Sequence, residues 1–218
     1  MPAGNYSIYL YHDDPTDMRA QATIERTSQP LRGEFLRAAA ISGAIMYRID
    51  MRLPSVLTSL FAGQMKVELF AGLLALLSGD GEFIKTQEHE TYPWAPDKLS
   101  SSSERRRFSL KINDDVNAGL LMSILAEVST RRRNSLLREL VIAGCAIHDL
   151  DARFVKLLSS MPEPPVSIQE LQQLTDKMLG LSVTKEMTAD AEVAGVQTSV
   201  SKPASSENTV RDNMRKIF

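Results

Sequence analysis

The chain has 218 residues, of which 43% are hydrophobic, and a formal net charge of −2. It is long enough to bury a sizeable core in one domain or two. Its single cysteine excludes an intramolecular disulfide and a site built from several cysteines, and is typical of a cytoplasmic protein. We expect no signal peptide and no membrane span, because the N-terminal residues lack a basic segment with an apolar run and the most apolar stretch, residues 67 to 79, is too short.

A short strand is predicted near the start of the chain, over residues 6 to 14. Its apolar side chains recur at every second position, as in a strand with one buried face: Tyr6, Ile8 and Leu10. The opposite face carries Ser7 and Tyr9. Asp13 and Asp14 follow the strand and suit a helix N-terminus, where carboxylates cap free amides and favour the helix dipole.

The helices of the first 79 residues differ in the strength of their patterns. The first is weak, with Met18, Ala22 and Ile24 as its apolar residues before Pro30 ends it. A stronger helix is predicted within residues 36 to 53, after a polar turn. Two short helices are expected next, at residues 54 to 61 and 66 to 77. Residues 80 to 104 then carry a net charge of −4 and are rich in serine and proline, which is typical of a linker.

The second half of the chain repeats the first. Residues 137 to 154 align with residues 36 to 53 at an offset of 101, and the matched positions include glycine at Gly43 and Gly144. The same offset pairs further residues: Leu36 with Leu137, Arg37 with Arg138, Asp50 with Asp151, and Arg52 with Arg153. A second strand, residues 108 to 116, aligns with the first at an offset of 102. The sequence therefore predicts two copies of one unit, residues 1 to 79 and 105 to 180.

The second copy has clearer helical patterns. Its first helix has a buried stripe at helical spacing: Leu121, Ile124, Leu125 and Val128. A polar turn at 130 to 135 should follow, with Asn134 or Ser135 as the N-cap of the next helix. Two short helices are expected at 153 to 160 and 167 to 179. Gly43 and Gly144 inside helices predict the close approach of another helix, because glycine otherwise destabilises a helix.

Positive charge is concentrated in the second copy. Residues 105 to 156 carry a net charge of +4. Two arginine triplets flank the strand and the turn between helices: Arg105, Arg106, Arg107 and Arg131, Arg132, Arg133. The first copy has only Arg32 near its turn and no basic residue in its strand.

The last part of the chain divides in two. Residues 181 to 208 are polar without a lasting period and are predicted to be disordered. Residues 209 to 218 can form an amphipathic helix. Its apolar side chains are Val210, Met214, Ile217 and Phe218, beside the basic residues Arg211, Arg215 and Lys216.

A single unit of this kind is incomplete, because its strand needs a second strand and its apolar face needs a second unit. Two strands paired antiparallel, with helices packed beneath, supply both and leave polar side chains on the outer face. A two-stranded ribbon fits the major groove of B-DNA, where such side chains reach base edges.

With a strand followed by two helices in each copy, the sequence resembles the ribbon-helix-helix DNA-binding fold. More narrowly, residues 105 to 218, with the strand RFSLKINDDVN, the helix RRRNSLLRELVIAGCAIHDLDARF and the terminal NMRKIF, resemble the ParR (StbB-type) adaptor of actin-based plasmid partition. The resemblance implies a bacterial, plasmid-encoded protein without a cofactor. Such a protein would bind centromere-like DNA repeats and use its C-terminal tail to capture an actin-like ParM filament, and it could assemble further on DNA or repress its own promoter.

The resemblance also assigns expected roles to residues. Ser7, Tyr9, Ser109 and Lys111 would read bases. Phosphates would lie against both arginine triplets and the amides near Asn134 and Ser135. Filament binding would use Val210, Met214, Arg215, Lys216, Ile217 and Phe218. The family's usual chain has one unit, so the doubled unit favours a pseudo-dimer within one chain, although exchange between two chains is the alternative.

Two other classes of protein compete with this interpretation. A ribbon-helix-helix repressor or antitoxin would share the DNA-binding part and differ in the tail. An enzyme is the other class, and Cys145 with His148 three residues later could form a thiolate and imidazole dyad on one helix face. The first copy has Ala44 and Tyr47 at these positions, so we expect a packing helix and no catalysis.

Overall fold

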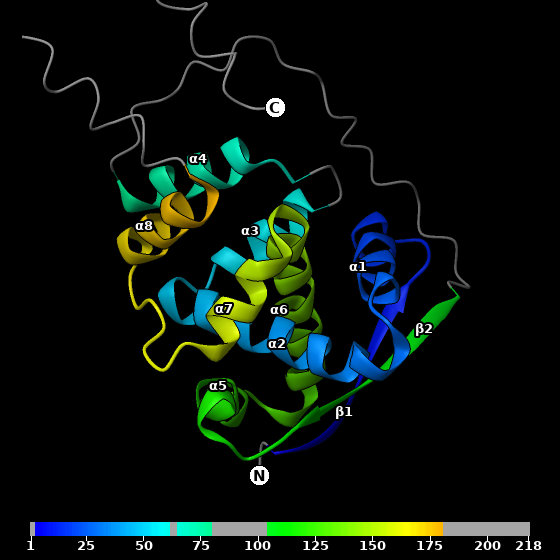
Figure 1. Ribbon diagram of the computed structural model, residues 1–218. Helices are drawn as coiled ribbons and strands as arrows, with labels where there is room; N and C mark the ends of the chain where they lie inside the picture. Colours follow the sequence, from blue (N-terminus) through cyan, green and yellow to red (C-terminus); the bar gives the residue numbers. More distant parts are fainter. Residues whose placement is uncertain (1–2, 62–64, 80–103, 181–218) are drawn as a thin grey trace, which may run out of the picture. The chain divides into compact units, whose positions relative to one another are not determined.

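A computed structural model describes residues 3–61, 65–79 and 104–180, and Figure 1 shows them as two strands beside a group of helices. Residues 3–61, 65–79 and 104–180 all belong to one compact unit, Met1–Leu181. The predicted linker, except for residue 104, and the predicted tail at 181 to 218 lie outside the described residues. The predictions made for those segments therefore stay predictions.

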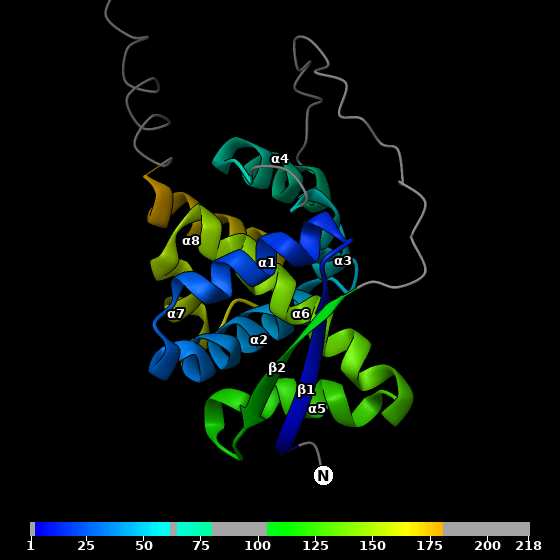
Figure 2. The ribbon, with the colours of Figure 1, turned by 90° about the vertical axis from the view of Figure 1, so that its right-hand side faces the viewer.

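The two strands form an antiparallel ribbon that joins the two copies. Strand β1 is Gly4–Tyr11 and strand β2 is Arg105–Ile112, and Ser7 lies opposite Ser109 at the centre. Figures 1 and 2 show the ribbon on one side of the helices. Both strands begin and end earlier than predicted, because Asp14 and Asp115 cap the next helical elements and the pairing extends back to Arg105 opposite Tyr11.

Alternation along the ribbon gives it a buried and an outer face, as predicted. Ile8 and Leu10 of β1 are almost completely buried, and Tyr6 is half-buried. The corresponding side chains of β2 are also buried: Phe108, Leu110 and Ile112. The ribbon therefore covers the helices with one apolar face.

Within the described ranges, four α-helices belong to each copy. The first copy has α1 Pro15–Arg26, α2 Arg32–Ile49, α3 Leu53–Leu60 and α4 Val67–Ser78, with a 3-10 turn η1 at Gln29–Leu31. The second copy has α5 Gly119–Glu127, α6 Thr130–Leu150, α7 Ala152–Ser160 and α8 Ile168–Leu179, with a 3-10 turn η2 at Val116–Ala118. Among the helices of the described ranges, none is both long and apolar enough to cross a membrane.

Packing between the copies is reciprocal. Helix α2 packs along α6, its counterpart at the repeat offset, and α4 packs along α8. Helix α2 also contacts α7, α5 and β2, while α6 contacts α3, α1 and β1. Because most of these contacts join elements of different copies, one continuous core is shared by both, and neither copy buries its apolar residues alone.

The two helix glycines lie at the crossing of α2 and α6, which confirms the predicted close approach. A Cβ built on Gly43 would lie 2.7 Å from the Cα of Leu140, and one built on Gly144 would lie 2.6 Å from the Cα of Ala39. Ala39 and Leu140 are themselves equivalent at the offset of 101. The crossing therefore contains two equivalent contacts, Gly43 against Leu140 and Gly144 against Ala39.

The predicted helix start at Asn134 or Ser135 is wrong. Helix α6 begins at Thr130, with Ser129 as N-cap, and the Ser129 carbonyl accepts hydrogen bonds from the amides of Arg132 and Arg133. The arginine run has no apolar period, yet arginine is a good helix former and extends the helix by an exposed turn.

The predicted apolar face of α1 is also largely wrong. Met18 is 54% exposed and Ala22 is exposed, and only Ile24 of the predicted set is buried. The buried positions are mainly small or polar: Thr16, Asp17, Ala20, Thr23 and Ile24. Burial of Asp17 depends on a partner from the other copy, which a local pattern does not reveal.

Candidate nucleic-acid interface

The outer face of the ribbon gathers polar and basic side chains from both strands. By alternation this outer ribbon face carries Asn5, Ser7, Tyr9, Arg105, Arg107, Ser109 and Lys111. Tyr11, the next residue in the alternation, has its ring centroid 5.9 Å from the guanidinium carbon of Arg138 in α6. All four β2 residues in this set and Asn5 are exposed, whereas Ser7 and Tyr9 are half-buried. The residues predicted to read bases, Ser7, Tyr9, Ser109 and Lys111, thus lie on one surface.

Two arginines pack against the predicted base-reading residues of β1. Arg107 Nε donates a 3.0 Å hydrogen bond to Ser7 Oγ. The guanidinium carbon of Arg105 lies 4.6 Å from the ring centroid of Tyr9. These contacts hold the two guanidinium groups over the ribbon, where their remaining N–H groups can donate to a ligand.

The first arginine triplet is divided between two environments. Arg105 and Arg107 belong to the outer ribbon face, as continuing the period of two back from Ser109 would have shown. Arg106 points the other way, with Nε 3.4 Å from Glu25 Oε1 and its guanidinium carbon 6.0 Å from the Phe108 ring centroid. The sequence pattern predicted the triplet as a flank of the strand and did not indicate Asn5, which the pairing places opposite Lys111.

The ribbon is a positively charged element. Its two strands contain four basic residues and no acidic one: Arg105, Arg106, Arg107 and Lys111. All four come from β2. Arg106 pairs with Glu25, and the other three lie on the outer ribbon face. A narrow basic surface of this kind favours a polyanion.

The second arginine triplet occupies the first turn of α6. Arg131 and Arg132 are exposed. Arg133 is half-buried, and its Nε donates a 3.0 Å hydrogen bond to the Val128 carbonyl at the end of α5. Arg32, its counterpart in the first copy, donates from Nε to the Thr27 carbonyl at 3.0 Å. Arg133 therefore has a structural role that both copies share.

Asn134 and Ser135 are exposed but lie inside α6, past its first turn. Their amides are therefore not the helix N-terminal donors that the sequence suggested. The start of α6, with its partial positive charge, lies instead at Thr130 to Arg132.

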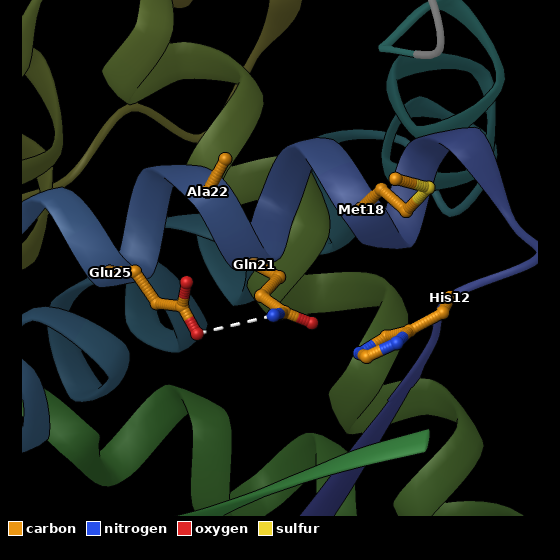
Figure 3. Close-up of a pocket in the computed structure, with 5 residues that line it drawn as sticks. All are labelled: His12, Met18, Gln21, Ala22 and Glu25. Atoms are coloured by element: carbon orange, nitrogen blue, oxygen red, sulfur yellow. Dashed lines mark hydrogen bonds between the residues drawn. The ribbon is translucent and has the colours of Figure 1, made fainter. Parts of the chain in front are cut away.

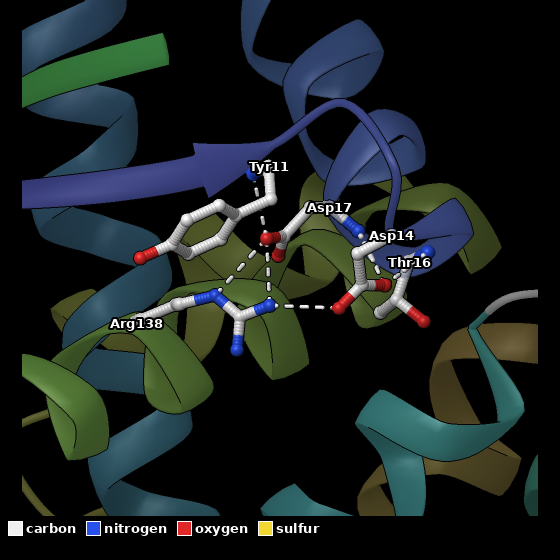
Figure 4. Close-up of polar contacts among 5 residues, drawn as sticks. All are labelled: Tyr11, Asp14, Thr16, Asp17 and Arg138. Atoms are coloured by element: carbon white, nitrogen blue, oxygen red, sulfur yellow. Dashed lines mark hydrogen bonds and ion pairs between the residues drawn. The ribbon is translucent and has the colours of Figure 1, made fainter. Parts of the chain in front are cut away.

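A buried ion pair anchors the end of β1 to α1 and α6 (Figure 4). Asp17 is fully buried, and its Oδ2 accepts a 2.8 Å hydrogen bond from the Tyr11 amide and lies 2.6 Å from the Arg138 guanidinium. Arg138 also contacts Asp14 at 2.9 Å, and Asp14 caps α1 by accepting from the Thr16 amide. Burial raises the pKa of Asp17 above its ordinary value, although the bonds from Arg138 and Tyr11 oppose this.

The opposite end of the ribbon has the reciprocal contact. Arg37 of α2 pairs with Asp115, which caps η2 by accepting from the Ala118 amide at 3.0 Å. Ala118 stands at the position equivalent to Asp17, so only the first copy has the buried carboxylate. These pairs tie each strand end to the central helix of the other copy.

A small depression of about 190 Å³ lies between the end of β1 and the exposed side of α1 (Figure 3). It is lined by His12, Met18, Gln21, Ala22 and Glu25. Gln21 Nε2 donates a 3.1 Å hydrogen bond to Glu25 Oε1, which also contacts Arg106. Both ionisable residues that line it already have partners. Glu25 pairs with Arg106, which holds the ribbon on α1, and His12 pairs with Glu104.

Cys145 and His148 lie in different environments on α6. Cys145 is fully buried in the core, and burial raises the pKa of its thiol far above the ordinary value. His148 is half-buried against the edge of Phe35, with ring centroids 4.8 Å apart, and burial lowers its pKa. The complete burial of Cys145 confirms the predicted packing role of this residue.

The predicted filament-binding residues lie outside the described residues, so their placement stays a prediction: Val210, Met214, Arg215, Lys216, Ile217 and Phe218.

Comparison with known proteins gives one family. A family model described as a plasmid stability protein matches the chain twice, over residues 4–72 and 106–175. The two ranges follow the two predicted copies and together cover more than half of the chain. No curated protein and no solved structure matches.

Proposed function

The chain belongs to the plasmid stability protein family, and from this membership we propose that it is a DNA-binding adaptor of plasmid partition. The observation that carries the proposal is the outer ribbon face, which presents two arginines, a lysine and neutral polar side chains on a two-stranded antiparallel ribbon. A ribbon of this kind fits the major groove of double-stranded DNA.

The proposed fold class is a ribbon-helix-helix pseudo-dimer made by one chain. The antiparallel pairing of β1 with β2 and the reciprocal contacts of α2 and α6 support it. In this arrangement Ser7 and Ser109 lie at the centre of the groove, and Lys111, Arg107 and Arg105 reach guanine acceptors.

Phosphate contacts are proposed at the first turn of α6. Arg131 and Arg132 are exposed there at the positive end of the helix dipole, a combination that binds anions. Arg133 is a weaker candidate, because it already donates to the Val128 carbonyl.

The C-terminal tail is proposed to capture an actin-like filament, as the resemblance to ParR implies. Its support is the amphipathic pattern of residues 209 to 218. The adaptor itself would need neither a catalytic site nor a cofactor, because nucleotide hydrolysis would belong to the filament partner. Binding near its own promoter would give autorepression.

The test is binding of the full chain to tandem repeats taken from DNA beside its own gene, compared with scrambled DNA at several salt concentrations. We expect preferential binding to the repeats, with an affinity that falls steeply as salt rises. Lys111→Ala should weaken binding about tenfold or more, whereas Lys177→Ala, which removes a basic residue from α8, should not. Equal binding to both DNAs would contradict the proposal.

The competing function is a ribbon-helix-helix repressor or antitoxin without filament binding. Removal of residues 209 to 218 separates the two. An adaptor should lose co-sedimentation of DNA with ParM-type filaments and keep its DNA affinity. Co-sedimentation that survives the truncation would show that the tail assignment is wrong.

A further inference from the structure

We infer that the protein binds an asymmetric, non-palindromic DNA site in one fixed orientation, an inference that rests on the proposed DNA-binding function. The ribbon has an approximate two-fold centre at Ser7 and Ser109. The positions that this centre relates carry different side chains in the two copies. The two halves of the outer ribbon face therefore present different chemistry to DNA.

One half of the ribbon is the end formed by the start of β1 and the end of β2. There Asn5 lies opposite Lys111, and both are exposed. Asparagine pairs with the N6 and N7 edge of adenine, and lysine donates to the O6 and N7 acceptors of guanine. This half is suited to a mixed adenine and guanine half-site.

The other half is formed by the end of β1 and the start of β2. Arg107 lies opposite Tyr9, and Arg105 lies opposite Tyr11 with its guanidinium over the Tyr9 ring. Two arginines with exposed side chains favour guanines, and arginine is the residue most often found in bidentate contact with guanine. This half-site should be richer in guanine.

The helix termini break the symmetry in the same way. The first turn of α6 contains Arg131 and Arg132, and the equivalent positions before α2 are Pro30 and Leu31. Phosphate neutralisation should therefore be stronger beside one half-site. Base contacts and phosphate contacts together fix the orientation of the protein on the duplex.

The experiment is selection of a randomised duplex library by the full chain, followed by sequencing of the bound pool. We expect one enriched motif that differs from its own reverse complement, with guanine enriched in one half. Palindromic duplexes built from either half alone should bind at least roughly tenfold weaker than the selected site. A palindromic motif would overturn the inference and leave the proposed DNA binding intact, whereas a pool without any enrichment would overturn the proposed function itself.

A variant of β1 tests whether the strand residues cause the asymmetry of the selected motif. Asn5 and Tyr9 are equivalent to Arg107 and Lys111 at the offset of 102, so Asn5→Arg with Tyr9→Lys places an arginine opposite a lysine on both sides of the centre at Ser7 and Ser109. Arg105, whose equivalent is Ala3, remains as the difference between the outer ends. This double variant should select a motif that is palindromic at its central positions, with guanine in both halves. If it folds, as judged by its thermal unfolding, and still selects the wild-type motif, the strand residues do not set the orientation and the inference is wrong.

Discussion

The side chain of Asp17 connects three elements of the fold. It binds the Tyr11 amide at the end of β1 and Arg138 in α6, and it is itself part of α1. Its removal leaves Arg138 with only the partly exposed Asp14. We expect Asp17→Ala to lower the free energy of unfolding by about 3 kcal/mol, the cost of breaking a buried ion pair. Urea denaturation measures this loss.

The matched control is the reciprocal pair at the other end of the ribbon. Asp115 is 39% exposed in its pair with Arg37, so Asp115→Ala should cost less, chiefly the loss of a cap. Equal losses for the two variants would show that burial does not distinguish the pairs.

The glycines at the helix crossing give a second prediction at the scale of the residue. A methyl group at Gly144 would meet the backbone of Ala39, which cannot move as a side chain can. Gly144→Ala should therefore lower the free energy of unfolding by about 1–3 kcal/mol. Gly72→Ala in α4 is the control, because its Cβ meets nothing within 4 Å and should raise stability by up to about 1 kcal/mol. Thermal unfolding of both variants would show opposite shifts.

Two aspartates make part of the stability depend on pH. Hydrogen bonds from Arg52 and Arg153 lower the pKa values of Asp50 and Asp151, respectively. A carboxylate with a lowered pKa in the folded state stabilises the fold above its ordinary pKa and loses that contribution as pH falls through the lowered value.

The double variant D50N/D151N tests this contribution. Asparagine can still accept the backbone hydrogen bonds that these aspartates accept, so the variant removes mainly the charge. It should be less stable than the wild type at pH 7, and the difference should shrink as pH falls below about 4. Denaturation at a series of pH values measures it. If the difference in stability between the variant and the wild type does not change with pH, the effect comes from altered hydrogen-bond geometry and not from the carboxylate charge.

At the scale of the element, the sequence predicts most of the strands and helices but not all of their ends. The period of two in the strands, the repeat offset and the helix glycines each depend on local or self-similar patterns, and each is found in the structure. The first turn of α6 was missed because exposed arginines carry no apolar period. The polar face of α1 was missed because Arg138, which neutralises Asp17, lies 121 residues away.

The candidate site was predictable to the same extent. Ser7, Tyr9, Ser109 and Lys111 share a face because alternation is a local property. The register that places Asn5 opposite Lys111 depends on pairing between copies, so the sequence pattern alone did not indicate the difference between the two halves.

The first turn of α6 should contribute to DNA affinity through charge. Arg131→Ala with Arg132→Ala should lower the slope of log affinity against log salt by about 2, one for each phosphate group that is no longer neutralised, without changing the selected motif. Fluorescence anisotropy across a salt series measures the slope. Arg48→Ala, an exposed arginine in the last turn of α2, is the control and should leave the slope unchanged.

At the scale of the whole molecule, the charges of the strands favour pairing of unlike copies. Each basic residue of β2 lies opposite an uncharged residue of β1, such as Arg107 opposite Tyr9. Two β2 strands paired about Ser109 would instead place Arg107 opposite Lys111 twice. Like charges directly opposite each other destabilise a ribbon. The first copy thus supplies a neutral partner strand as well as half of the core.

This complementarity predicts how the two copies behave as separate fragments. Residues 104 to 218 alone should unfold at lower temperature and with less cooperativity than the intact chain, because α2 and β1 no longer cover the buried faces of α6 and β2. Mixing with residues 1 to 79 should restore helix content and give a complex with one copy of each fragment, measured by circular dichroism and native mass spectrometry. The intact chain, at 24.2 kDa, should be a monomer at the same concentration. If the intact protein instead forms a particle of twice that mass, strand exchange between two chains is favoured. If residues 104 to 218 form a stable homodimer that does not bind the first fragment, strand charge does not direct the pairing.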